Sequence, residues 1–76
     1  MNIQEQQKSA LGILWRTFEF NKSMLAKELG VSRQTVNNWF SRGRISATYA
    51  IIASEHKKVK ITKEEMRPDV KEWFGV

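Results

Sequence analysis

The chain has 76 residues, 13 of them basic and 8 acidic, with one histidine, no cysteine and a formal net charge of +5. A chain of this length forms one small domain, here residues 1–76, and buries only about 60% of the surface that its unfolded form exposes. Disulfide bridges and cysteine-based metal sites are excluded as sources of stability, so tight helical packing or association with a second copy is expected to supply it.

The first predicted helix covers roughly residues 3–19. Asn2 and Glu5 have the spacing of a capping box at its start. Apolar residues then follow in steps of three and four, which is typical of one face of an amphipathic helix. They are Ile3, Ala10, Leu11, Leu14, Trp15 and Phe18. We expect this face to form the core, and a helix that binds a membrane surface or a partner is the alternative.

The next two predicted helices are short and lie close together, over residues 23–41. Ser23, in preference to Asn21, is the expected N-cap of the first, and Gly30 ends it in the left-handed conformation. Ser32 is the expected N-cap of the second, which covers about residues 32–41 and ends at Gly43.

A fourth helix is predicted after Ser46, its N-cap. Tyr49, Ile52 and Ala53 are expected to face inward, and His56 lies near the end of the helix, where the helix dipole favours histidine. A single histidine without neighbouring ligands predicts no metal site.

The last third of the chain alternates loop and short helix. Residues 57–62 are expected to form a loop or a short extended piece, followed by a capping box between Thr62 and Glu65. Pro68 ends that helix near Arg67, because the residue before a proline leaves the helical region. The apolar residues of the tail over 69–76 are expected to pack on the core or to form a dimer contact. They are Val70, Trp73 and Phe74.

Residues 23–41 satisfy the packing demands of a helix-turn-helix. The helix crossing needs a small residue, the sharp turn needs glycine, and both helices need apolar residues on their shared face. Seven residues meet these demands at fixed offsets: Leu25, Ala26, Leu29, Gly30, Val31, Val36 and Trp39. The chain is therefore predicted to form an all-α, compact bundle of about five helices that contains a helix-turn-helix, and an ordinary helical hairpin is the alternative.

The outward face of the second motif helix carries no acid and many groups that bond nucleic acid. Arginine can donate two hydrogen bonds to guanine, and glutamine or asparagine can pair with adenine. The expected base-reading residues are Arg33, Gln34, Asn37 and Asn38. Short hydroxyls, helix N-terminal amides and basic side chains hold phosphates. The expected contacts to the DNA backbone are Lys22, Ser23, Ser32, Thr35, Ser41, Arg42 and Arg44.

Charge and the pattern of polar residues narrow the class of protein. Residues 31–63 carry a net charge of +6 and the rest of the chain −1, which favours a polyanionic partner, although a solvated basic face is an equally open interpretation. No paired carboxylates, nucleophile with a base or phosphate-binding glycine loop appears, so we expect no enzyme, cofactor or small-molecule substrate. No membrane span or signal pattern is present, and the cytoplasm is the expected location.

Two segments, LAKELGVSRQTVNNWFSRGRIS and VKITKEEMRPD, resemble the Cro-type repressors of temperate phages, and especially the Cro/YdaS-like group of prophage regulators and antitoxins. The resemblance covers about residues 22–70. It implies a lambda-repressor-like bundle that binds a pseudo-palindromic operator as a dimer, with the same base-reading residues and with phosphate contacts near Lys22, Ser32, Ser41 and Arg42. Family members often have a glycine turn where this chain has Lys57, Lys58 and Lys60, so the role of these lysines stays open.

Three functions are compatible with these sequence features. The leading one is a phage or prophage repressor that binds a double-stranded operator as a homodimer, formed before binding or only on the DNA. An antitoxin that represses its own operon is the second. A protein-interaction module, in which the helices serve only as scaffold, is the third.

Overall fold

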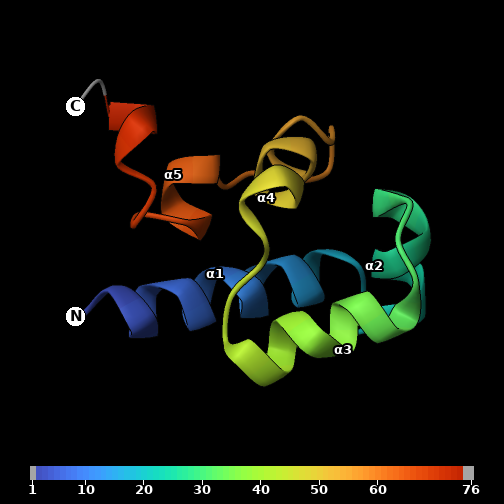
Figure 1. The fold of residues 1–76 in the computed structure, drawn as a ribbon. Helices are drawn as coiled ribbons and strands as arrows, with labels where there is room; N and C mark the ends of the chain where they lie inside the picture. Colours follow the sequence, from blue (N-terminus) through green and yellow to red (C-terminus); the bar gives the residue numbers. More distant parts are fainter. Residues whose placement is uncertain (1, 75–76) are drawn as a thin grey trace.

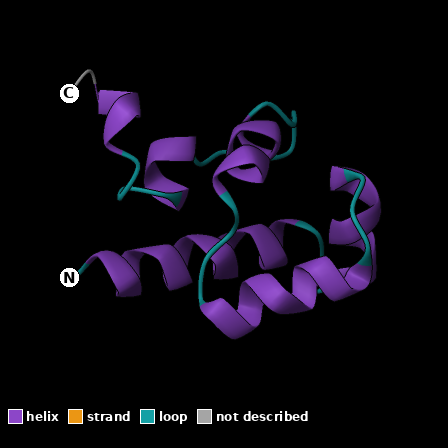
Figure 2. Cartoon of the chain, viewed as in Figure 1, coloured by secondary structure: helices purple, strands orange, loops and turns teal. Residues whose placement is uncertain are grey.

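The computed structural model describes residues 2–74, which form helices and loops without a strand (Figures 1 and 2). The elements in this range are α1 (Ile3–Thr17), α2 (Lys22–Leu29), α3 (Arg33–Arg42), α4 (Ala47–Ser54), α5 (Lys63–Met66) and a final 3₁₀ helix, η1 (Lys71–Phe74). The predicted all-α bundle of about five helices is confirmed. None of the described helices is long and apolar enough to cross a membrane.

The first helix begins where the sequence predicted and ends two residues early. The side chain of Asn2 accepts a hydrogen bond from the backbone N–H of Glu5 at 2.8 Å and caps α1. At the other end, Glu19 and Phe20 have φ angles of 60° and 57°, and this left-handed pair turns the chain toward α2. Ile3, at the start of the predicted apolar face, is 49% exposed. This face is therefore buried only from its middle onward.

The predicted N-cap of α2 is wrong by two residues. Asn21, not Ser23, caps the helix: its Oδ1 accepts a hydrogen bond from the backbone N–H of Met24 at 3.0 Å. Ser23 is the second residue of α2 and is exposed. Because both residues are good caps, the choice depends on where the preceding left-handed turn delivers the chain.

The connection between α2 and α3 has the order and packing of a helix-turn-helix. Gly30 ends α2 with a φ angle of 73°, and Val31 donates its backbone N–H to the carbonyl oxygen of Ala26 at 2.9 Å. Ser32 then caps α3, as predicted. Ala26 is 4% exposed, and this small side chain allows α2 and α3 to pack closely.

The predicted inward face of α4 is confirmed at Ala53, and Tyr49 packs partly buried against the core, but the prediction is wrong at Ile52. Ser46 caps the helix as expected, but the fully buried residues are Ala50 and Ala53, while Ile52 is 41% exposed. The short alanine side chains let α4 approach α2 and α5 closely, and this rotates Ile52 toward solvent. His56 lies beyond the helix, after its C-cap Glu55.

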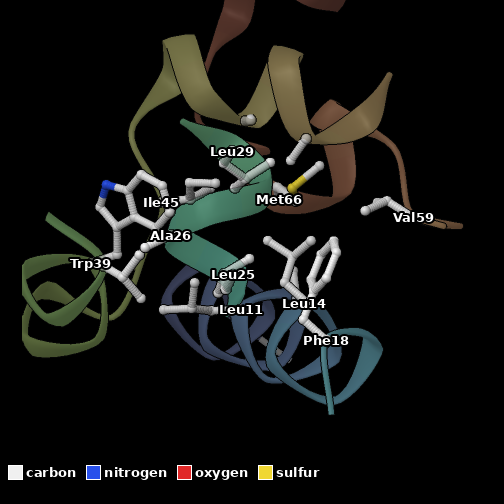
Figure 3. Close-up of a cluster of buried hydrophobic side chains, with 14 residues drawn as sticks. Leu11, Leu14, Phe18, Leu25, Ala26, Leu29, Trp39, Ile45, Val59 and Met66 are labelled. Carbon is white, nitrogen blue, oxygen red and sulfur yellow. The ribbon is translucent and has the colours of Figure 1, made fainter. Parts of the chain in front are cut away.

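One hydrophobic cluster joins all five helices (Figure 3). Its largest fully buried side chains are Phe18, Leu14, Leu25, Ile45, Met66 and Val36. In Figure 1, α3 lies on one side of α1, and α4 and α5 lie on the other. The arrangement leaves the long outer side of α3 free of the other described helices.

A polar network connects the segment after α5, residues 67–69, to α1 and to the α3–α4 connection. Arg67 donates two hydrogen bonds to Asp69, at 2.8 Å from Nε and 2.7 Å from Nη2, and a third to the carbonyl oxygen of Ile45 at 3.1 Å. Gln7, a buried residue of α1, donates a hydrogen bond of 2.8 Å to Asp69 Oδ1, the same atom that accepts from Arg67 Nε. The hydrogen bonds that Asp69 accepts, led by those from Arg67, lower the pKa of Asp69 to about 2.

Replacing Asp69 with asparagine is predicted to destabilise the fold by about 1–2 kcal/mol, because a partly exposed charge-assisted network is lost. The pKa of Asp69 in the folded chain lies below its ordinary value, so the ionised carboxylate stabilises the fold above about pH 4. That contribution disappears as the pH falls from about 4 to about 2. Urea unfolding at several pH values measures both effects, and Asp69→Asn should flatten the acid limb.

The matched control for this prediction is Glu72→Gln, which removes an exposed carboxylate of η1 outside the network. The control should unfold like the unaltered protein. An acid limb that is equally steep with and without Asp69 would contradict the assignment.

Candidate nucleic-acid interface

The start of α3 is organised by its cap. The Ser32 Oγ atom accepts a hydrogen bond from the backbone N–H of Thr35 at 3.1 Å and lies 3.0 Å from the Thr35 hydroxyl. The hydroxyls of both residues therefore serve the cap, while the first amides of a helix have no helical acceptor and point out of its end. Arg33 and Gln34 occupy this first turn and are exposed.

The outward face of α3 brings most of the predicted base-reading residues together. Arg33, Gln34 and Asn38 are exposed, and Asn37 is half-buried. Gln34 donates a hydrogen bond from Nε2 to Asn38 Oδ1 at 3.1 Å, so the two amides are already aligned one turn apart. The opposite face holds the buried Val36 and Trp39, as predicted.

A cationic and aromatic cluster joins Lys22, at the start of α2, to Trp15 of α1 and Phe40 of α3. The ammonium group of Lys22 stands 4.6 Å from the ring centre of Phe40 and 5.8 Å from that of Trp15. Trp15 also makes edge contacts with Phe20 and Phe40. The cluster fixes the positive charge of Lys22 at the junction of α1, α2 and α3.

A polar hollow of about 450 Å³ opens next to this cluster. Its lining residues are Trp15, Glu19, Phe20, Asn21, Lys22, Ser23 and Arg33. The hollow thus joins three predicted contact residues, Lys22, Ser23 and Arg33. Glu19 places an acid at its rim, next to residues that the sequence pattern marks as contacts to DNA.

The other end of α3 carries Ser41 and Arg42, both exposed. Gly43 ends the helix with a φ angle of 81°. Arg44 follows, and its Nη1 lies 3.7 Å from Asp69 Oδ2 while its side chain stays 48% exposed. The predicted backbone contacts therefore occupy both ends of α3 and the turn beyond it.

Two residues that the sequence pattern does not mark as contacts lie against this second end. Gln4 and Lys8 of α1 line a hollow of about 620 Å³ together with Ser41, Arg42 and Arg44. In the sequence, Lys8 is distinguished only by its position beside the apolar face of α1. Which part of α1 lies next to α3 depends on tertiary packing, so no local signal could identify it.

The lysines of residues 57–60 do not join this surface. They lie in the loop after α4, on the other side of α1 from α3 (Figure 1). The positive charge of residues 31–63 is therefore divided between two sides of the molecule. His56 in the same loop faces Glu28, with 2.8 Å between Nε2 and Oε1, and this hydrogen bond lowers the pKa of Glu28.

The predicted dimer contacts lie in the tail. Val70 and Trp73 are half-buried, and Trp73 packs against the core with the ammonium group of Lys63 at 5.2 Å from its ring centre. The side chain of Phe74 lies outside the described residues. Trp73 thus contacts its own core, and its contact with a second copy stays a prediction.

Comparison with known proteins gives one family. The family model described as bacterial toxin YdaS matches residues 21–73, which include the helix-turn-helix and the Arg67–Asp69 network. No curated protein matches the chain, and no solved structure does.

The two glycines that bound α3 and its turn are predicted to differ in their tolerance of alanine. Gly30→Ala should lower the free energy of unfolding by about 1–2 kcal/mol, because the backbone at this position is left-handed. No further cost is expected there, since no atom beyond the adjoining residues lies within 4 Å of the new Cβ. Gly43→Ala should cost about 0.5–1 kcal/mol more, because its Cβ would lie 3.1 Å from Cε and 3.2 Å from Cγ of Lys8. Thermal unfolding compares the two variants.

A Lys8→Ala background provides the control, since it removes the crowding side chain. The difference between the two glycine variants should vanish there. Equal costs for both variants in the unaltered background would contradict the contact between Lys8 and Gly43.

Proposed function

The chain belongs to the YdaS family, and from this premise we propose that it binds double-stranded DNA in a sequence-specific manner and represses transcription. The observation that carries the proposal is the outward face of α3. All ten residues of this helix lack a carboxylate, and its exposed side chains are those that hydrogen-bond bases and phosphates. Phosphate repulsion explains the missing acids, whereas a merely soluble helix would favour glutamate.

The proposed docking places α3 in the major groove. The first turn, with Arg33 and Gln34, meets base edges, and Asn37 and Asn38 follow one turn further along. Lys22 and Ser23 at one end and Arg42 and Arg44 at the other meet the flanking phosphates. A helix held in this way has its reading face in the groove and its basic ends on the two strands.

In this proposal, the protein binds a pseudo-palindromic operator as a homodimer in the cytoplasm of a bacterial cell. Repression would follow because the occupied operator excludes polymerase from an overlapping promoter. The small core of a 76-residue chain supports association, since a second copy would bury additional surface.

A second candidate function comes from the name of the family, which is that of a bacterial toxin. Such a chain would harm a bacterial cell when produced in excess, either by occupying DNA or by acting on another target. Growth after induced expression separates the possibilities. Toxicity that disappears in Arg33→Ala and Gln34→Ala variants would act through DNA, and toxicity that persists would identify another target.

Selection of bound sites from random duplexes at near-physiological salt tests the proposed function. We expect an enriched palindrome with half-sites about one helical turn apart. Binding should weaken steeply as salt rises, with a log–log slope of about 0.9 per phosphate neutralised. Absence of both enrichment and salt dependence would favour a protein-interaction module.

Arg33→Ala and Gln34→Ala are each predicted to lower affinity for the selected site by about 1–3 kcal/mol and to relax its sequence. Arg42→Ala is the comparator, since it removes an exposed charge at the far end of α3 and should weaken all duplexes alike. Repeating the selection with each variant measures the effect. An unchanged preferred sequence in the Arg33 and Gln34 variants would show that the docking is wrong.

Trp73→Ala is predicted to weaken the homodimer, because it removes the largest apolar side chain of the described tail. Sedimentation with and without the selected duplex measures the association. Trp73→Phe keeps an aromatic ring against the core and is the matched control. A folded Trp73→Ala variant with an unchanged monomer–dimer equilibrium would contradict a role for the tail in the dimer.

A further inference from the structure

We propose that Lys8 and Gln4 of α1 complete a phosphate-binding site with Arg42 and Arg44, so that the DNA interface extends beyond the helix-turn-helix. The inference rests on the proposed function and names a part of the interface that lies outside residues 21–73, the range matched by the family model. Its ligand is a backbone phosphate of the duplex, next to the C-terminal end of α3.

The position of Lys8 is fixed by the end of α3. Three carbons of its side chain, Cε, Cγ and Cδ, lie 3.1, 3.2 and 3.8 Å from the place that a Cβ of Gly43 would occupy. The aliphatic part of Lys8 therefore lies along the glycine backbone. The ammonium group lies beyond Cε, and Lys8 shares the lining of the adjoining hollow with Arg42 and Arg44.

The hollow beside this contact has the chemistry of an anion site. It measures about 620 Å³ and is lined by Gln4, Gln7, Lys8, Phe40, Ser41, Arg42, Gly43 and Arg44. Its lining therefore has three cationic side chains, two amides and a hydroxyl, and no carboxylate. Gln4 precedes Lys8 by one helical turn, so the two share a face of α1.

Asp69, the carboxylate beside Arg44, does not cancel this charge. Asp69 bonds Arg67 at 2.7 and 2.8 Å and accepts the amide of Gln7 at 2.8 Å, whereas Arg44 is 3.7 Å away. Arg67 therefore supplies the principal counter-charge of Asp69. The cations Lys8, Arg42 and Arg44 remain in excess around the hollow.

Continuity with α3 identifies the source of the phosphate. Ser41 and Arg42 belong both to the lining of the hollow and to the exposed end of α3. A duplex that follows the outward face of α3 passes this end, where its backbone meets the cations. A free phosphate ion shares the same chemistry, and the measurements with Lys8→Met separate the two sources.

Lys8→Met tests the site, because methionine keeps an unbranched apolar side chain against Gly43 and removes the charge. Lys27→Met is the matched control: Lys27 is exposed on α2, next to Glu28, which faces His56 on the side of α4. The affinity of each variant is measured against salt, for the selected duplex and for a random one. Lys8→Met should lower the log–log slope by about 0.9 and weaken both duplexes by the same factor. Lys27→Met should retain the original slope.

Several outcomes would overturn the inference. One is a salt slope for Lys8→Met equal to that of the unaltered protein. This holds even if the melting temperature of the variant falls, since the charge of Lys8 would then only stabilise the C-terminal end of α3. Another is an equal loss of slope in Lys27→Met, which would show a non-specific effect of net charge. A third is thermal stabilisation by inorganic phosphate that depends on Lys8 while the DNA slope does not, since the site would then hold a free anion.

The failure of this inference is distinguishable from failure of the proposed function. If the unaltered protein binds no duplex in a salt-dependent way, the proposed function fails, and this inference with it. If it binds and Arg33→Ala relaxes the selected sequence, but Lys8→Met keeps the original slope, the proposed function stands and only the α1 site is wrong.

Discussion

The close packing of α2 against α3 at Ala26 is the constraint on which the rest of the molecule depends. Ala26 is 4% exposed, and its carbonyl oxygen accepts the backbone N–H of Val31, so the same residue sets the end of α2 and the approach of α3. The buried face of α2 also packs on α1 and α4. A larger side chain at this crossing would separate α3 from α2 and would disturb the packing that α2 shares with its other neighbours.

Elements with a strong local signal could be predicted from the sequence. Ser32 and Gly43 bound α3 as expected, and the capping box of Thr62 and Glu65 begins α5. The errors occurred where a local signal was shared or absent. Asn21 and Ser23 are equally good caps, and the left-handed turn before them decides between the two. The exposure of Ile52 follows from the way α4 uses alanines to approach its neighbours, which depends on residues far away in the chain.

The candidate site divides in the same way. Polarity alone separates the two faces of α3, so its outward residues could be named before the fold was known. The Arg67–Asp69 pair lies within a short segment of the sequence, but its bond to Gln7 spans 62 positions and has no local signature. Lys8 belongs to the same class, since its contact with Gly43 exists only when α1 and α3 are packed.

The two faces of α3 have separate tasks, and this separation makes the fold a reusable frame. Val36 and Trp39 carry the packing, whereas the side chains of Gln34 and Asn38 bond each other on the outside. Exchanges among polar residues at the outer positions leave the buried cluster untouched, so surface chemistry and folding stability vary independently. A lineage with this frame can diversify the outer face of one helix in small steps while every intermediate still folds.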